Sequence, residues 1–440
     1  MKIKKSNVYF NILMICTGLN IILNYGFSNF GLRIGAIIIP ATQIVMLLGI
    51  VKLIQKRSFL ISIKRSYIPI LLLFLIFIVR VPYDFIRYGA LALRDATHYM
   101  DMLFVIIADQ VTYRYLLSNK YGYKKIWKYV RWIFVTSFSY LIICNIPPLY
   151  QVLLSISPVY IGLQGPIRLM GSKVFVILWL IVFMTLFYQI MKGSHKQLRL
   201  NFIPVFLVFL LLIAIDGRAT IISFIFVIVL YSIIRRNREI GYLNRFILIL
   251  IPIVLIFLLS GISIQIGNVT ISGDYYYNLM LSIFGQGNLS SKSDGTELRL
   301  SWWIEIISNN FSSITDFLFG QGFGSALTNF YDAKGHLVRE PHNSTLSVFG
   351  RMGMVGLILW YTLLIRTLVK SIRGLKSRSI HLKENVFTIT MIIVFWVVSL
   401  VEVVFEYSYL TMPFYTFLGM FEAMRRYRSI NISIEKKTHI

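Results

Sequence analysis

The chain has 440 residues, of which 57% are hydrophobic and only 14% are charged, and its formal net charge at pH 7 is +26. Soluble domains carry about a quarter charged residues, so this composition excludes an ordinary soluble enzyme and predicts a helical protein that crosses a membrane repeatedly. The charge does not indicate nucleic-acid binding, because the basic residues lie in short stretches between apolar runs. The two cysteines, Cys16 and Cys144, form no disulfide or metal pattern.

Apolar runs of roughly 20 residues predict about twelve spanning helices and an all-α, polytopic fold. The runs lie near 8–25, 34–51, 67–81, 99–117, 130–146, 174–191, 200–215, 219–234, 246–264, 345–369, 386–405 and 409–424. The first run follows a basic N-terminus without a small-residue cleavage site, which favours a spanning helix over a cleaved signal. Basic residues between the runs gather on one side of this topology, which places both termini in the cytoplasm.

Two segments on the opposite side are predicted to be largely irregular. Segment 147–173 contains four prolines and three glycines, and segment 265–342 is about 80 residues long, too long for an ordinary connection. Within the second, Asp294 as a cap and Glu297 three residues later predict a short helix. One face of that helix is apolar, which places it on the membrane surface or the top of the bundle; this face contains Leu300, Trp303, Ile304 and Ile307.

These assignments divide the chain into three parts. Residues 1–264 hold spans one to nine, and residues 265–344 form a large outer loop that carries part of the active site. Residues 345–440 hold spans ten to twelve and a basic cytoplasmic tail.

Arg218 lies in a turn between two short apolar runs of about 16 residues each. At 1.5 Å per residue, each run is about 24 Å long, less than the roughly 30 Å hydrocarbon core, so the turn is expected in a cavity below the surface. A charge at such depth is costly and usually functional. The alternative is an arginine that reaches up to the outer headgroups.

Arg299 lies on the predicted surface helix, beside two tryptophans. A guanidinium group binds phosphate oxygens through planar, bidentate hydrogen bonds, so Arg299 and Arg218 together would suit a diphosphate. The alternative is a solvated residue or an ion pair with Glu297 or Glu305.

His342 follows Pro341 at the start of the tenth predicted span. A neutral imidazole there can accept a proton from a hydroxyl nucleophile. The alternative is an interfacial polar residue, with the adjacent Asn343 acting only as the cap of the helix.

A glycine cluster, Gly320, Gly322 and Gly324, has no strand before it. It therefore favours a turn with close backbone approach over a nucleotide-binding loop. In the tenth span, glycines at 350, 353 and 356 favour close helix packing.

Other charged residues are candidates of second rank, for which pairing inside the bundle is the alternative. Arg351 is an intramembrane charge that needs a partner. Glu402 and Glu406 are expected one turn apart on the eleventh span. A further polar set is expected around spans three and four: Arg80, Arg94, Asp101 and Asp109.

Three segments, in this order, resemble the motifs of the O-antigen polymerase and ligase superfamily of bacterial envelopes. Segment 215–224, around Arg218, resembles the family's Ser/Gly-Arg motif. Segment 299–324 is similar to its Arg-x-x-x-Trp helix with a following glycine turn, and segment 341–357 resembles its His-Asn signature. The resemblance covers roughly the C-terminal half. Family members often carry an acid where this chain has Arg351, so one of three other acids would have to substitute: Glu340, Glu402 or Glu406.

The resemblance implies glycosyl transfer on the periplasmic side of the bacterial inner membrane, from an undecaprenyl-diphosphate-linked oligosaccharide. By this reading Arg218 and Arg299 bind the diphosphate leaving group, and His342 orients or deprotonates the acceptor hydroxyl. Arginines can replace a metal at a diphosphate, so no cofactor and no metal are expected. Partners are membrane lipid and, in the same pathway, a chain-length regulator and a flippase; nucleic acid is not expected.

Three functions fit the resemblance to different degrees. The leading one is a polymerase that transfers a growing chain onto the next lipid-linked repeat unit, since no acceptor site for lipid A–core is recognisable. The nearest alternative is the O-antigen ligase, which moves the chain onto lipid A–core. A flippase or transporter of lipid-linked sugar is less favoured, because repeated halves and interrupted midplane helices are not visible.

Overall fold

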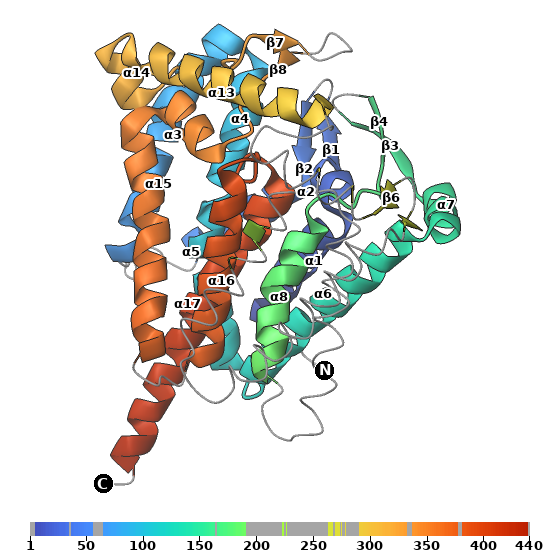
Figure 1. Cartoon of the computed structure of the whole chain (residues 1–440). Helices are drawn as coiled ribbons and strands as arrows, with labels where there is room; N and C mark the ends of the chain where they lie inside the picture. Colours follow the sequence, from blue (N-terminus) through green and yellow to red (C-terminus); the bar gives the residue numbers. More distant parts are fainter. Residues whose placement is uncertain are drawn as a thin grey trace.

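The computed structural model describes residues 5–34, 37–55, 65–162, 165–190, 222–223, 226, 263–266, 269–272, 274, 278, 290–331, 337–376 and 381–438. These residues are mainly helical (Figure 1). The helices are α1 (Lys5–Ser28), α2 (Ala41–Gln55), α3 (Ile68–Tyr88), α4 (Ala90–Met100), α5 (Leu103–Ser118), α6 (Gly122–Asn145), α7 (Pro147–Ile156), α8 (Val176–Ile190), α13 (Ser290–Phe311), α14 (Ile314–Phe319), α15 (Ser344–Lys376), α16 (Leu382–Ser399) and α17 (Ser408–Thr438).

Four short antiparallel hairpins, which were not predicted, accompany the helices, and the described part of the chain is otherwise helical as predicted. They are β1 (Gly31–Ile34) with β2 (Ile37–Pro40), β3 (Val159–Gly162) with β4 (Gly165–Arg168), β5 (Ile264–Ile266) with β6 (Val269–Ile271), and β7 (Phe330–Tyr331) with β8 (Leu337–Val338). None of them is part of a larger sheet among the described residues.

Four of the described helices are long and apolar enough to cross a membrane: Val8–Ser28, Ile68–Tyr88, Ser344–Leu375 and Leu382–Ser399. The bent pair α6 and α7, with 107° between its parts, would make a fifth if it is one span. These helices and the composition are those of an integral membrane protein. Three predicted spans, 200–215, 219–234 and 246–264, lie almost entirely outside the described residues, so the count of twelve stays a prediction.

Two predicted boundaries are wrong for local reasons. The predicted span at 34–51 begins as the β1–β2 hairpin, and only Ala41–Gln55 is helical, because the β-branched residues 37–39 followed by Pro40 favour a strand over a helix. The predicted irregular segment 147–173 instead contains α7 and the β3–β4 hairpin. Two prolines occupy the first turn of α7. Proline is favoured there because the N–H groups of a first helical turn have no partner within the helix, so the missing N–H of proline costs nothing.

Two further corrections concern the region of the candidate site. The helix predicted to begin at Asp294 begins at Ser290, so Asp294 is not its cap. Glu402 and Glu406 do not lie on a helix, because α16 ends at Ser399 and residues 400–407 form a non-helical turn before α17.

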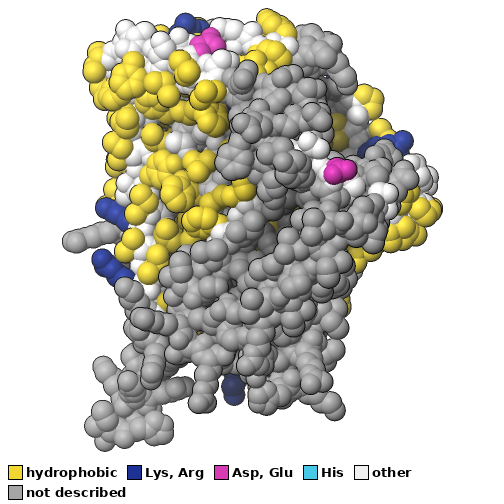
Figure 2. Space-filling view, in the orientation of Figure 1, with side chains coloured by type: hydrophobic (Ala, Val, Ile, Leu, Met, Phe, Trp, Pro, Cys, Tyr) yellow, Lys and Arg dark blue, Asp and Glu magenta, His cyan; other side chains and the backbone are white. Residues whose placement is uncertain are grey.

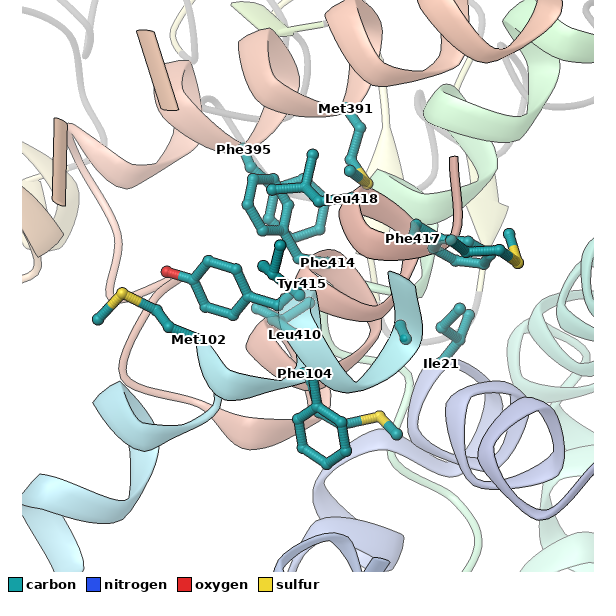
Figure 3. Packing of buried hydrophobic residues seen from close by; sticks show 14 of the residues in the cluster. Ile21, Met102, Phe104, Met391, Phe395, Leu410, Phe414, Tyr415, Phe417 and Leu418 are labelled. Carbon is teal, nitrogen blue, oxygen red and sulfur yellow. The ribbon is translucent and has the colours of Figure 1, made fainter. Parts of the chain in front are cut away.

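The core lies where α17 runs along α5, with α1, α8 and α16 packed around them. Figure 3 shows Phe395, Phe414 and Tyr415 close together in this core, with Phe417 pointing away on the other side. The indole of Trp179 on α8 lies 4.8 Å from the Phe395 ring and 5.6 Å from the Phe417 ring, measured between ring centroids. Large aromatic side chains of this kind bury much apolar area, so their packing stabilises the bundle.

Helix α15 bends at Gly353, whose φ of 63° and ψ of −164° are not helical. Such a bend frees carbonyl groups of the preceding helical turn. The freed carbonyls of Gly350 and Arg351 accept hydrogen bonds from the backbone N–H groups of Gln321 and Gly322, at 2.7 and 3.3 Å. These two hydrogen bonds attach the glycine turn (residues 320–324) to the start of α15. The close backbone approach that the glycine cluster predicted is thereby confirmed.

Replacing Gly320 with alanine should destabilise the protein more than the same change at Gly89. Both have positive φ, 74° and 62°, with ψ of 176° and −141°, a backbone region that essentially only glycine adopts and that costs another residue roughly 1–3 kcal/mol. A Cβ at Gly320 would also lie 2.4 Å from the carbonyl carbon of Arg351, whereas a Cβ at Gly89 would meet nothing within 4 Å. Thermal unfolding in detergent, followed with a dye that reacts with the buried thiols of Cys16 and Cys144, measures both variants. Equal losses would contradict the close approach.

Candidate functional site

A carboxylate joins His342 and Arg299, which come from different elements. Glu402, in the turn after α16, places Oε2 3.1 Å from His342 Nδ1 and Oε1 3.5 Å from an Arg299 Nη2. Arg299 on α13 also donates to the carbonyl oxygen of Val401 at 3.0 Å. The three side chains remain about one-third exposed, at 33% for His342, 31% for Arg299 and 28% for Glu402. This group, called the triad below, is therefore accessible to a substrate.

His342 has a strained backbone that its neighbours hold in place. Its φ is 51°, which costs a residue other than glycine about 1–3 kcal/mol and is typical of functional sites. The Trp303 indole N–H donates to the Pro341 carbonyl at 2.8 Å, just before the histidine. The Trp302 ring stacks on the imidazole with 6.2 Å between centroids and 26° between planes. These contacts determine the position of the imidazole before any substrate binds.

Asn343 caps α15 and also contacts the acidic turn. Its Oδ1 accepts from the N–H of Leu346 at 3.1 Å, the hydrogen bond expected of an N-cap residue. Its amide donates to the carbonyl of Leu400 at 3.0 Å. The capping interpretation is thus confirmed, and the same residue positions the turn that carries Glu402.

Ser344 attaches the turn at residues 400–407 to the start of α15. Its hydroxyl donates to Glu406 Oε2 at 2.7 Å and accepts from the N–H groups of Val404 and Phe405 at 3.0 and 3.1 Å. Burial, with the negative charge of Glu340 beside it, raises the pKa of Glu406 to about 7. Glu406 lies behind the triad and is not a member of it.

Charged groups of α3 hold the far side of the glycine turn. Arg80 donates to the carbonyls of Phe319 and Gly320 at 2.8 and 2.7 Å. Asp84, itself paired with Arg80, accepts from the N–H of Phe323 at 2.7 Å. Arg80 therefore contacts the glycine turn and not the triad.

Arg351 is buried, with 1% of its side chain exposed, and it pairs with two acids. It lies 2.6 Å from Asp95 on α4 and 2.6 Å from Glu340. Burial opposes ionisation of Asp95, but the charges of Arg351, Arg94 and Arg339 outweigh it and hold the pKa of Asp95 below its usual value. The partner that Arg351 needs is thus an acid on another helix, together with Glu340 before the triad histidine.

The structure separates the remaining predicted polar set. Arg94 pairs with Asp95 at 2.7 Å, and Asp101 accepts from Thr411 at 2.6 Å. Asp109 contacts Tyr67 and Arg426 instead. These three residues therefore pair within the bundle, as the alternative interpretation predicted. Arg218 lies outside the described residues.

Sequence reasoning missed three residues that organise the site. Asp95 directly follows Arg94, and Asp84 lies four residues after Arg80; both arginines were candidates. An acid between apolar residues of a membrane protein is itself a signal of a buried role. Trp302 was noted only as a neighbour of Arg299, because sequence spacing alone cannot show that its ring meets the His342 imidazole.

Within the described part of the chain, no group of three or more His, Cys, Asp or Glu side chains could hold a metal ion. Residues 203–361 match the family model described as O-antigen ligase. The match contains Arg218, Arg299, His342 and the glycine turn, whereas Glu402 lies beyond it. A search of curated proteins found no match to the chain.

Proposed function

Because residues 203–361 carry the O-antigen ligase domain, the chain is a membrane protein of the O-antigen polymerase and ligase superfamily, and we propose that it polymerises lipid-linked oligosaccharide repeat units. The donor in this proposal is an undecaprenyl-diphosphate-linked chain at the periplasmic face of the inner membrane. The acceptor is a hydroxyl of the next lipid-linked repeat unit.

The shared carboxylate of Glu402 is the observation that carries the proposal. It lies within 3.1 Å of the histidine and 3.5 Å of the arginine that the sequence motifs singled out independently. A base and a cation held by one carboxylate are suited to a reaction in which a hydroxyl loses a proton while an anion departs.

His342 supplies the base. An ionised Glu402 accepts from Nδ1–H, which fixes the tautomer and leaves the Nε2 lone pair to accept a proton. The acceptor oxygen attacks C1 of the donor sugar, its proton passes to His342, and the C1–O bond to the diphosphate breaks.

Arg299 binds the departing diphosphate. A guanidinium has five N–H donors, and among the described residues Val401 and Glu402 accept from two of them. The remaining donors can bind phosphate oxygens as negative charge develops there. We assign Arg218 to the same diphosphate from its sequence motif, and in this proposal no metal takes part.

The test is gel analysis of surface glycans in a strain that lacks the gene and carries the wild-type chain or no chain. Without a polymerase, the product stops at lipid A–core plus one repeat unit, because ligation continues. Transfer by the purified protein should persist in EDTA. Loss of transfer with EDTA and its recovery with magnesium would contradict the metal-independent mechanism.

The second candidate function is ligation of the finished chain to lipid A–core, which is favoured by the description of the matching family as O-antigen ligase. Both reactions break the same sugar–diphosphate bond and differ in the acceptor. Bare core with accumulating lipid-linked long chains in the deletion strain would identify the ligase and overturn the polymerase proposal.

A further inference from the structure

The side chains of α13 fall into three strips along the helix, as a spacing of about 100° per residue requires. One strip is buried against the rest of the protein and contains Trp302, Ile306 and Asn310. A second is exposed and polar, with Ser301, Ser308 and Asn309. The third is exposed and apolar: Leu300, Ile304, Ile307 and Phe311 are 54%, 61%, 43% and 63% exposed.

A solvated helix has two kinds of face, one buried and one polar. A third, apolar face that is left open is typical of a helix lying in a membrane interface, where one side meets lipid and another meets water. The four apolar residues follow the 4-3-4 spacing of a single stripe, so their exposure is not a scatter of isolated surface residues.

The apolar stripe continues into the lipid-facing sides of two spanning helices. The Phe311 ring at its end lies 6.3 Å from the Phe349 ring of α15, measured between centroids. Beyond it, Ile314 and Phe319 of α14 are 70% and 46% exposed, and Arg80 of α3 binds the Phe319 carbonyl. Figure 2 shows hydrophobic side chains over α14 and down α15 below it.

The exposed sides of α3 and α15 are apolar as well, for example at Val79, which is 70% exposed, and Ile358, which is 57% exposed. Both helices are candidate spans, so these sides face the hydrocarbon core. A surface that is continuous with them and borders a polar strip lies at the boundary between lipid and water.

We propose that α13 and α14 form an interfacial anchor, with the stripe Leu300–Ile304–Ile307–Phe311 seated in the lipid leaflet on the side of the triad. The occupant of this surface is membrane lipid and not a second protein. Arg299, on the same helix, is then held near headgroup depth. If the proposed function is right, that is the depth of the diphosphate of a membrane-anchored donor.

The test uses two exposed positions on different sides of α13, about 140° apart at 100° per residue. Bimane is attached to Ile304→Cys, on the apolar stripe, or to Asn309→Cys, on the polar strip, in protein in phosphatidylethanolamine–phosphatidylglycerol nanodiscs. The endogenous Cys16 and Cys144 are buried. Lipids brominated near the headgroup should quench most of the emission at 304 and little at 309, and aqueous iodide should do the reverse.

Equal quenching at the two positions by either agent would overturn the anchor. Protection of position 304 from both quenchers would also overturn it, because a second copy or another protein would then cover the stripe. The readout needs no glycan transfer, so it is independent of the proposed function.

A separate measurement tests the link between the anchor and Arg299, that is, whether the anchor places Arg299 at the depth of the donor diphosphate. Ile304→Glu should lower transfer from a full-length polyprenyl donor and leave transfer from a short, water-soluble prenyl-diphosphate analogue unchanged, with Asn309→Glu on the polar strip as the matched control. An equal loss with both donors would overturn the link while leaving the anchor itself to the quenching result.

Discussion

Replacing His342 with asparagine should slow glycan transfer by about 10²–10⁴-fold, the usual contribution of a general base. Asparagine tolerates the positive φ of this position better than most residues do, so the φ of 51° is retained and the loss reports on the imidazole. The measurement is the initial rate of transfer by purified protein in nanodiscs with a lipid-linked donor.

Glu402→Gln should cause a smaller loss of transfer than His342→Asn. An amide can still accept from Nδ1–H but carries no charge, so a charge-assisted hydrogen bond of about 1.5–3 kcal/mol becomes an ordinary one. A loss of roughly tenfold to a hundredfold should follow. His342→Asn at the wild-type rate would refute the assignment of the base and would leave a transport or scaffold function open.

Replacing Arg351 with methionine should destabilise the protein by about 3–5 kcal/mol, because it removes the buried cation that pairs with both Asp95 and Glu340. Only 1% of this side chain is exposed, and it lies 2.6 Å from both Asp95 and Glu340. The start of α15, with His342 and the glycine turn, depends on the same region, so activity should be lost together with the fold. Thiol-dye unfolding at Cys16 and Cys144 measures the midpoint.

Arg94 provides a matched control for this variant. It pairs with the same Asp95 at 2.7 Å, but 32% of its side chain is exposed. Water screens such a pair, so Arg94→Met should cost within about 1 kcal/mol. If the two variants unfold at the same temperature, burial does not set the importance of Arg351, and the ion cluster has a different role.

The predicted elements succeeded where a local pattern was enough. The apolar run at 67–81 became α3, and the cap at Asn343 was recognised from the residue type beside a helix start. Failures arose where two local preferences competed. At 34–51 an apolar run long enough to span also contained residues that favour a strand, and at 147–173 proline was taken to end helices when it starts one.

For the site, residue chemistry identified Arg299 and His342 but left three acids as possible partners of the histidine. The structure shows that Glu402 contacts both, while Glu340 pairs with Arg351 and Glu406 with Ser344. No periodicity could distinguish these acids, because the choice depends on how α13, α15 and the turn after α16 pack together.

The membrane class of this protein follows from the lengths of its apolar runs, since hydrocarbon thickness acts on each run separately. The resemblance of the short motifs to one superfamily, and the match of residues 203–361 to the family described as O-antigen ligase, could also be found from the sequence, because each motif is local. The contact between His342 and Glu402 joins residues 60 positions apart, and that between Arg351 and Asp95 joins different helices. Such pairings are consequences of packing, so only the tertiary structure could assign each charge its partner.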